Sequence, residues 1–203
     1  MEEFGAMNYV GLDLAGSTKR PTGACIINNA LNVQCCVVHS DEEVLALVRH
    51  SGSKVVAIDA PLALPTGRHC LGEHCRGRQH FRACDIALRR MGIRFFPITL
   101  GPMRTLTARG MRLRKRLQHL RFEVIETYPG AAQDIQGIRR KQYGFTQLQD
   151  SLRKMGCRGD ITKRQLTGDE LDAISCALVA RDYARGHYLA VGNPAEVMMI
   201  LPG

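Results

Sequence analysis

The stretch MNYVGLDLAGSTKRPTG, residues 7–23, decides the fold of this chain. Residues 9–14 form an apolar run typical of a short buried strand, and Asp13 stands near its end. Small and turn-forming residues follow, so residues 23–27 are expected to return as the second strand of a hairpin. An ionised carboxylate is costly in apolar surroundings unless it is paired or holds a cation. Asp13 therefore marks either an acid at the mouth of a hairpin or a cation site.

The composition indicates a globular protein, and its positive charge favours an acidic partner. A chain of 203 residues with 45% hydrophobic residues fits one domain, 1–203, and excludes extensive disorder. The formal net charge of +9 favours nucleic acid, DNA or RNA, as partner. No apolar run is long enough to cross a membrane, and the acidic opening is unlike a secretory signal. Eight irregularly spaced cysteines then favour reduced thiols and a cytoplasmic location.

The order of the expected elements indicates a mixed α/β fold. Residues 33–38 add a third strand to the hairpin, which makes an antiparallel meander. Two further apolar strands of parallel type are expected at residues 54–59 and 122–127. Helices are expected at residues 41–48, 79–91, 102–120, 145–155 and 166–185, a long loop at 64–82, and a final strand or tail at 196–201.

Carboxylates stand at the ends of these elements. Asp13, Asp59 and Glu126 each lie at the carboxyl end of an apolar strand, where open α/β sheets place their sites. Thr167 and Glu170 form a capping box for the last helix, and Asp172 lies on the first turns of that helix. Each acid alone fits a cap, a turn or the surface. Together they favour a site for Mg²⁺ or Mn²⁺, which prefer oxygen ligands and can cleave phosphodiesters.

Five stretches carry a resemblance to a known family: GLDLAGSTKRPTG, VVAIDAPLALPTGR, RACDIALRRMGI, VIETYPGA and ELDAISCALVARDYARG. They resemble the predicted ribonuclease-H-like nucleases labelled domain of unknown function 429. The resemblance implies a ribonuclease H-like fold with a mixed five-stranded sheet flanked by helices, and an insertion at about 62–121. It implies catalytic metal ligands at Asp13, Glu126 and Asp172, with Asp59 as an accessory or fourth ligand. Asp169 is a further candidate, although a helix dipole favours an acid there regardless of function.

The loop at residues 64–85 is rich in cysteine and histidine. Cys70, Cys75, His80 and Cys84 are candidate ligands for a second metal, zinc or an iron–sulfur cluster. The loop lacks a CxxC pair, so reduced core cysteines and a basic substrate loop are the alternative interpretation.

Basic residues gather in the expected helix at 102–120. Such a run is usually a solvated helix face, but this one has little compensating acid nearby in the sequence. Contact with the phosphate backbone is the second interpretation. The candidate nucleic-acid contacts are Lys19, Arg20, Arg112, Lys115 and Arg116. Aromatic residues are scarce, which argues against base stacking as the main binding term.

The sequence thus favours a divalent-metal-dependent nuclease, and two other functions stay open. A non-catalytic nucleic-acid-binding protein would keep the carboxylates as structural groups. An actin-like or sugar-kinase-type phosphotransferase is suggested by the turn after Asp13, but it needs a second lobe to enclose ATP.

Overall fold

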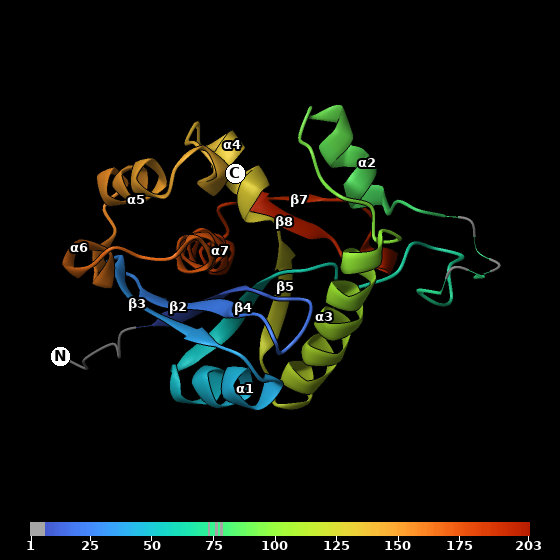
Figure 1. Ribbon diagram of the computed structural model, residues 1–203, viewed down its shortest axis with the longest axis horizontal. Coiled ribbons are helices and arrows are strands. Elements are labelled where there is room, and N and C mark those ends of the chain that lie inside the picture. The colour runs from blue at the N-terminus through green and yellow to red at the C-terminus, as the bar shows by residue number, and fades with distance from the viewer. Residues whose placement is uncertain (1–6, 73, 76, 78) are drawn as a thin grey trace.

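A mixed β-sheet forms the centre of the computed structural model, which describes residues 7–72, 74, 75, 77 and 79–203 (Figure 1). Its strands in chain order are β1 (Asn8–Asp13), β2 (Thr22–Asn28), β3 (Asn32–Val38), β4 (Ser53–Asp59), β5 (Glu123–Thr127), β6 (Arg158–Gly159), β7 (Tyr188–Val191) and β8 (Met199–Pro202). They lie side by side in the order β6-β3-β2-β1-β4-β5-β8-β7. The described residues therefore form eight strands and not the expected five, because short strands extend both edges of the sheet.

The pairing of the central strands brings the expected acids together. β1 and β2 form the expected antiparallel hairpin, in which Asp13 lies opposite Gly23. β1 then pairs in parallel with β4, and this register sets Asp13 beside Asp59. β4 pairs in parallel with β5, with Ile58 beside Glu126. The carboxyl ends of β1, β4 and β5 therefore meet at one edge of the sheet.

Helices cover both faces of the sheet (Figure 1). They are α1 (Asp41–His50), α2 (Ala83–Arg90), α3 (Gly101–His119), α4 (Pro129–Ile135), α5 (Phe145–Lys154), α6 (Asp160–Lys163) and α7 (Gly168–Ala184), with 3-10 turns η1 (Lys141–Tyr143) and η2 (Pro194–Glu196). Side chains alternate along a strand, so Tyr9 packs toward α7 whereas Val10 packs toward α1 and α3. The protein thus has a helix–sheet–helix layering with an apolar core on each face.

Two glycines allow α7 to approach the sheet at backbone distance. A Cβ at Gly11 would lie 2.2 Å from the carbonyl oxygen of Ala173, and one at Gly23 would lie 2.0 Å from that of Asp169. Any side chain at either position would push the helix away. The capping box of Thr167 and Glu170 is present as expected. These contacts fix the start of α7 next to the end of β1.

The segment expected as an insertion, 62–121, contains α2 and α3. No helix or strand occurs among its described residues before Ala83, as expected for a long loop. The helix expected from residue 79 begins at Ala83, because the Asp85 carboxylate accepts the Arg82 backbone N–H and caps it there. Leu113 and Leu117 of α3 are fully buried in the core beneath the sheet.

The described part of the chain contains no helix that is both long and apolar enough to cross a membrane.

Candidate functional site

A cavity of about 250 Å³ opens at the carboxyl ends of β4 and β5. Three of the expected acids, Asp59, Glu126 and Asp172, line it. Asp13 and Asp169 line an adjoining hollow formed with the turn after β1 and the start of α3. The structure therefore gathers all five expected acids at one edge of the sheet, in two neighbouring depressions.

A lysine lies at the centre of three of these acids. Lys141 Nζ donates hydrogen bonds to Asp13 Oδ2 at 2.9 Å and to Asp169 Oδ1 at 3.0 Å, and lies 2.9 Å from Asp172 Oδ2. Strand β1 supplies the first acid, the N-terminal turns of α7 supply the other two, and η1 supplies the lysine. An ammonium group therefore holds the position at which these carboxylates converge.

A glutamine and one further acid complete the surroundings of Lys141. Gln133 Nε2 of α4 donates to Asp172 Oδ1 at 2.7 Å, which fixes the orientation of that carboxylate. Asp59 shares the face of Asp13 because their positions are paired across β1 and β4. Within the described residues, no hydrogen bond or ion pair to the Asp59 carboxylate is found. Asp59 is thus the acid whose oxygens stay available to a ligand.

Burial and charge repulsion disfavour the ionised forms of Asp13 and Asp59. Burial raises the pKa of Asp13 from 3.8 to about 7, against the opposing effect of Lys141. Burial also raises the pKa of Asp59 well above its usual value, and the charges of Asp13 and Asp172 add to the effect. The Lys141 pKa rises because the charges of Asp13 and Asp172 outweigh the burial that would lower it. One ammonium does not compensate the group fully, and a second positive charge would be favourable.

Glu126 lies on the opposite face of the sheet from Asp13 and Asp59. Its cross-strand neighbour is Ile58 of β4, whose side chain packs toward α3. Paired residues of adjacent strands point to the same face of a sheet, so the Glu126 side chain also points toward α3. Its Oε2 accepts hydrogen bonds from the Leu62 backbone N–H and from Arg82 Nη1, both at 2.7 Å. Arg82 is 1% exposed and also binds Asp85. Glu126 thus has a buried arginine as its partner and is set apart from the Lys141 cluster.

The donor chemistry of the Lys141 cluster suits a hard divalent cation. Mg²⁺ prefers carboxylate oxygens at about 2.0–2.1 Å. The carboxylates surround the larger ammonium group instead, and in the part of the chain that the structure describes no three acidic, histidine or cysteine side chains already form a metal site. A cation could enter only if Lys141 withdrew and the acids closed inward. The carboxylates with suitable oxygen ligands for such a cation are those of Asp13, Asp59, Asp172 and Asp169. Glu126 could become a ligand only if it broke its ion pair with Arg82.

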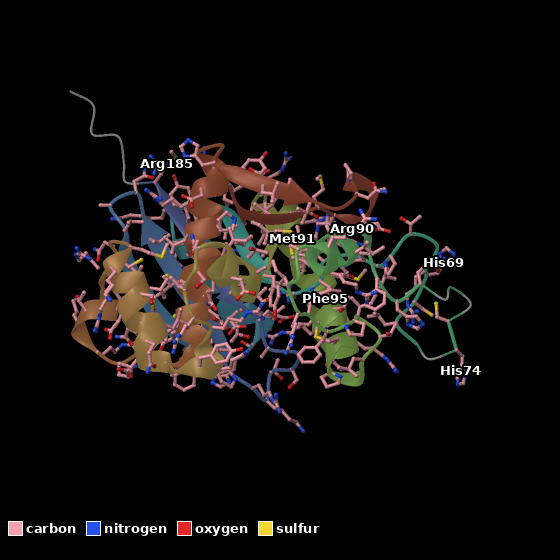
Figure 2. The ribbon with its side chains drawn as sticks, turned by 90° about the horizontal axis from the view of Figure 1, so that it is seen from above. His69, His74, Arg90, Met91, Phe95 and Arg185 are labelled. Carbon is pink, nitrogen blue, oxygen red and sulfur yellow. The ribbon has the colours of Figure 1, made fainter. Side chains whose placement is uncertain are left out.

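The cysteine- and histidine-rich loop is organised by an arginine. The Arg68 side chain is buried and donates hydrogen bonds to the backbone carbonyls of Cys70, Gly72, Gly77 and Gln79. Figure 2 shows His69 and His74 on the outer part of this loop. The loop is therefore held together by a guanidinium group, in the segment where the sequence suggests a second metal.

The four candidate ligands for a second metal have separate environments. Cys84 is buried in an apolar cluster with Leu88 and Leu201. His80 hydrogen-bonds Thr99 through Nδ1. A hydrogen bond from Cys70 lowers the pKa of Cys75 to about 6. Cys70 and Cys75 are thus neighbours, whereas Cys84 and His80 are engaged elsewhere.

The expected basic contacts occupy two places. Arg20 lines the hollow that holds Asp13, and Lys19 is exposed on the same turn. Arg112, Lys115 and Arg116 lie together on α3 beside α1, and by helix rise they begin about 9 Å beyond Leu106, which lines the cavity. Arg116 pairs with Glu42 of α1, an acid that the sequence does not place near α3. The α3 patch could therefore contact a nucleic acid only at a distance from the carboxylates.

Sequence reasoning missed the two cations of the site. Lys141 is 128 residues from Asp13 and Arg82 is 44 residues from Glu126. The run Arg139–Lys141 was a usable signal, because these three consecutive basic residues have a single acid, Asp134, between residues 127 and 149. Gln133 had no comparable signal, since α4 was not expected.

One comparison with known proteins gives a match over most of the chain. The family model described as "Protein of unknown function (DUF429)" matches residues 11–197, which include the end of β1, the strands β2 to β7 and every acid of the site. No curated protein matches the chain.

Proposed function

The chain belongs to the DUF429 family of proteins of unknown function, and from this premise we propose that it is a divalent-metal-dependent nuclease. Its fold is proposed to be a single ribonuclease H-like domain. The antiparallel β1–β2–β3 meander, followed by α1 and the parallel strands β4 and β5, supports this assignment.

One observation carries the proposal. Oxygens of Asp13, Asp169 and Asp172 converge to within 3.0 Å of one cationic nitrogen at the carboxyl edge of the sheet. Asp59 lies beside them without a partner among the described residues. The ionised forms of such acids repel one another, and groups with perturbed pKa values cluster at functional sites.

Asp13, Asp59 and Asp172 would hold the ion, Mg²⁺ or Mn²⁺, with Asp169 as a further ligand. A divalent ion held there supplies an activated water and stabilises the leaving oxygen of a phosphodiester. Gln133 orients Asp172 through its 2.7 Å hydrogen bond. Lys141 neutralises the acids in the metal-free protein and, once displaced, becomes available to a substrate phosphate. Arg82 holds Glu126 at the cavity wall, so that Glu126 shapes the site from the opposite face.

Metal-dependent cleavage tests the proposal. Labelled single-stranded, duplex and branched DNA and RNA would be incubated with Mn²⁺ or Mg²⁺ and with EDTA. Wild type should cleave at least one substrate only with metal, and Asp13→Asn should reduce the rate by orders of magnitude. Asp150→Asn is the matched control, because Asp150 is an exposed acid of α5 paired with Arg153. Equal rates for Asp13→Asn and wild type would refute the proposal.

The Lys141 cluster also favours a second candidate function. The ammonium already pairs with three acids, so the carboxylates could serve as a purely structural ion-pair network in a non-catalytic nucleic-acid-binding protein. Such a protein would bind nucleic acid equally well in EDTA and in Mn²⁺, and its melting temperature would not change with Mn²⁺. The nuclease should instead be stabilised by millimolar Mn²⁺.

A further inference from the structure

We propose that a groove beside the carboxylate cavity binds single-stranded nucleic acid by stacking exposed aromatic rings on unpaired bases; this inference rests on the proposed nuclease function. The chain has six phenylalanines, five tyrosines and no tryptophan. Five of these rings line one groove, which we call the aromatic groove: Phe81, Phe95, Phe96, Tyr128 and Tyr143. The few aromatic residues are thus concentrated next to the site.

Two of the five rings are free to receive a base. Phe81 packs edge-on against Phe95 at 5.9 Å and carries Arg89 over its face at 4.3 Å. Phe96 is 70% exposed and Tyr143 is 63% exposed, and within the described residues neither has a ring or cation partner. Exposing such rings to water is unfavourable. A flat apolar ligand that covers Phe96 and Tyr143 would remove this cost.

The charge of the groove favours a polyanion. Arg89, Arg94 and Arg140 line it together with a single acid, Asp134. Arg140 binds Asp134 through two hydrogen bonds and so neutralises it. Among the described residues, neither Arg89 nor Arg94 pairs with an acid, so both guanidinium groups can contact phosphates. Rings for bases and arginines for the backbone are the combination found in single-strand binding grooves.

The aromatic groove and the carboxylate cavity are continuous. Phe95, Phe96, Tyr128 and Arg140 line both of them. A strand lying on Phe96 and Tyr143 would therefore lead its backbone toward Asp59 and Asp172. Bases in a duplex are stacked on each other and paired, so they cannot reach the rings. The occupant that fits is therefore a single strand. The low aromatic content of the whole sequence does not indicate such stacking, because it does not show that the few rings gather in one groove.

Binding without metal separates this inference from the proposed cleavage. Fluorescence anisotropy in EDTA would use labelled oligo-dT and oligo-rU of about 12 nucleotides and a duplex of mixed sequence and equal length. Phe96→Ala and Tyr143→Ala should each weaken single-strand binding roughly tenfold. Phe96→Trp should retain it, because the larger ring still stacks. Thermal melting would confirm that each variant is folded.

Tyr188→Ala is the matched control and should bind like wild type. Tyr188 is 39% exposed and packs on Tyr183, whose hydroxyl bonds Glu123 at the start of β5, the opposite end from Tyr128. Unchanged binding in both alanine variants, or duplex binding as tight as single-strand binding, would overturn the inference even if metal-dependent cleavage is found. Ring-dependent binding without any cleavage would support the groove and count against the nuclease.

Discussion

Replacing Asp13 by asparagine should stabilise the metal-free protein at pH 8. A pKa raised from 3.8 to about 7 means that the folded protein disfavours ionised Asp13 by up to about 4 kcal/mol, at 1.36 kcal/mol per unit. The asparagine keeps an acceptor for Lys141 but still buries a polar amide, so we expect a net gain of about 2 kcal/mol. For a chain of this size, this gain raises the melting temperature by about 4–8 °C.

The pH dependence gives the prediction a second signature. Because its folded pKa is raised, Asp13 keeps its proton in the folded state up to about pH 7, and the wild type loses stability as the pH rises from about 4 to about 7. The variant lacks this titration, so its advantage should be small at pH 5 and full at pH 8. The other charged groups that face Asp13, namely Lys141, Asp59, Asp169 and Asp172, are present in both proteins.

Urea unfolding at pH 5, 6, 7 and 8 in EDTA would measure both effects, and thermal melts with Mn²⁺ would follow at pH 8. The variant should show a smaller rise in melting temperature on addition of Mn²⁺ than wild type, because one ligand charge is lost. Lower stability of Asp13→Asn at pH 8 would refute the reasoning, since it would mean that the pair with Lys141 outweighs the cost of burial.

Three other variants test the two cations of the site and the basic patch on α3. Lys141→Met should lower the metal-free melting temperature and tighten Mn²⁺ binding on the order of tenfold by calorimetry, because the built-in cation no longer competes; unchanged affinity would contradict this displacement. Arg82→Met should cost about 3–5 kcal/mol in urea unfolding, because Glu126 is left as an uncompensated buried charge; a loss below about 1 kcal/mol would disagree. Changing the basic α3 patch to alanine should weaken binding to any sequence and flatten its dependence on salt, whereas an unchanged slope would identify a solvated helix face. The residues changed are Arg112, Lys115 and Arg116.

Long periodic elements of the fold could be predicted from the sequence. The hairpin after Asp13, the apolar strand ending at Asp59 and the helix capped by Thr167 and Glu170 are all present. The edge strands could not be predicted, because β6 has two residues and β7 is a partly exposed four-residue segment without clear alternation. Helix α4 was not predicted, because it begins with Pro129 and Gly130, a pair that is typical of a turn.

The gathering of acids at one sheet edge could also be predicted, but their partners could not. Strand-end position places Asp13 beside Asp59, whereas the face on which Glu126 lies depends on the register between β4 and β5. Pairing with Arg82 and Lys141 depends on how distant loops fold back over the cavity. The run Arg139–Lys141 signals cations in need of partners, but the local sequence does not identify which acids they bind.

The contact between α7 and the glycines of β1 and β2 has a consequence for hydrogen exchange. Because the helix backbone rests directly on the strands at Gly11 and Gly23, α7 cannot tilt or slide without separating from the sheet. The Asp169 and Asp172 carboxylates are carried on that helix. Local opening of the site would therefore require α7 to leave the core, so amide protons of its central turns should exchange only through global unfolding. Asp169 and Asp172 are thus carried on a helix that we expect to be strongly protected, so adjustment to a ligand falls to side-chain movement and to Lys141 on η1.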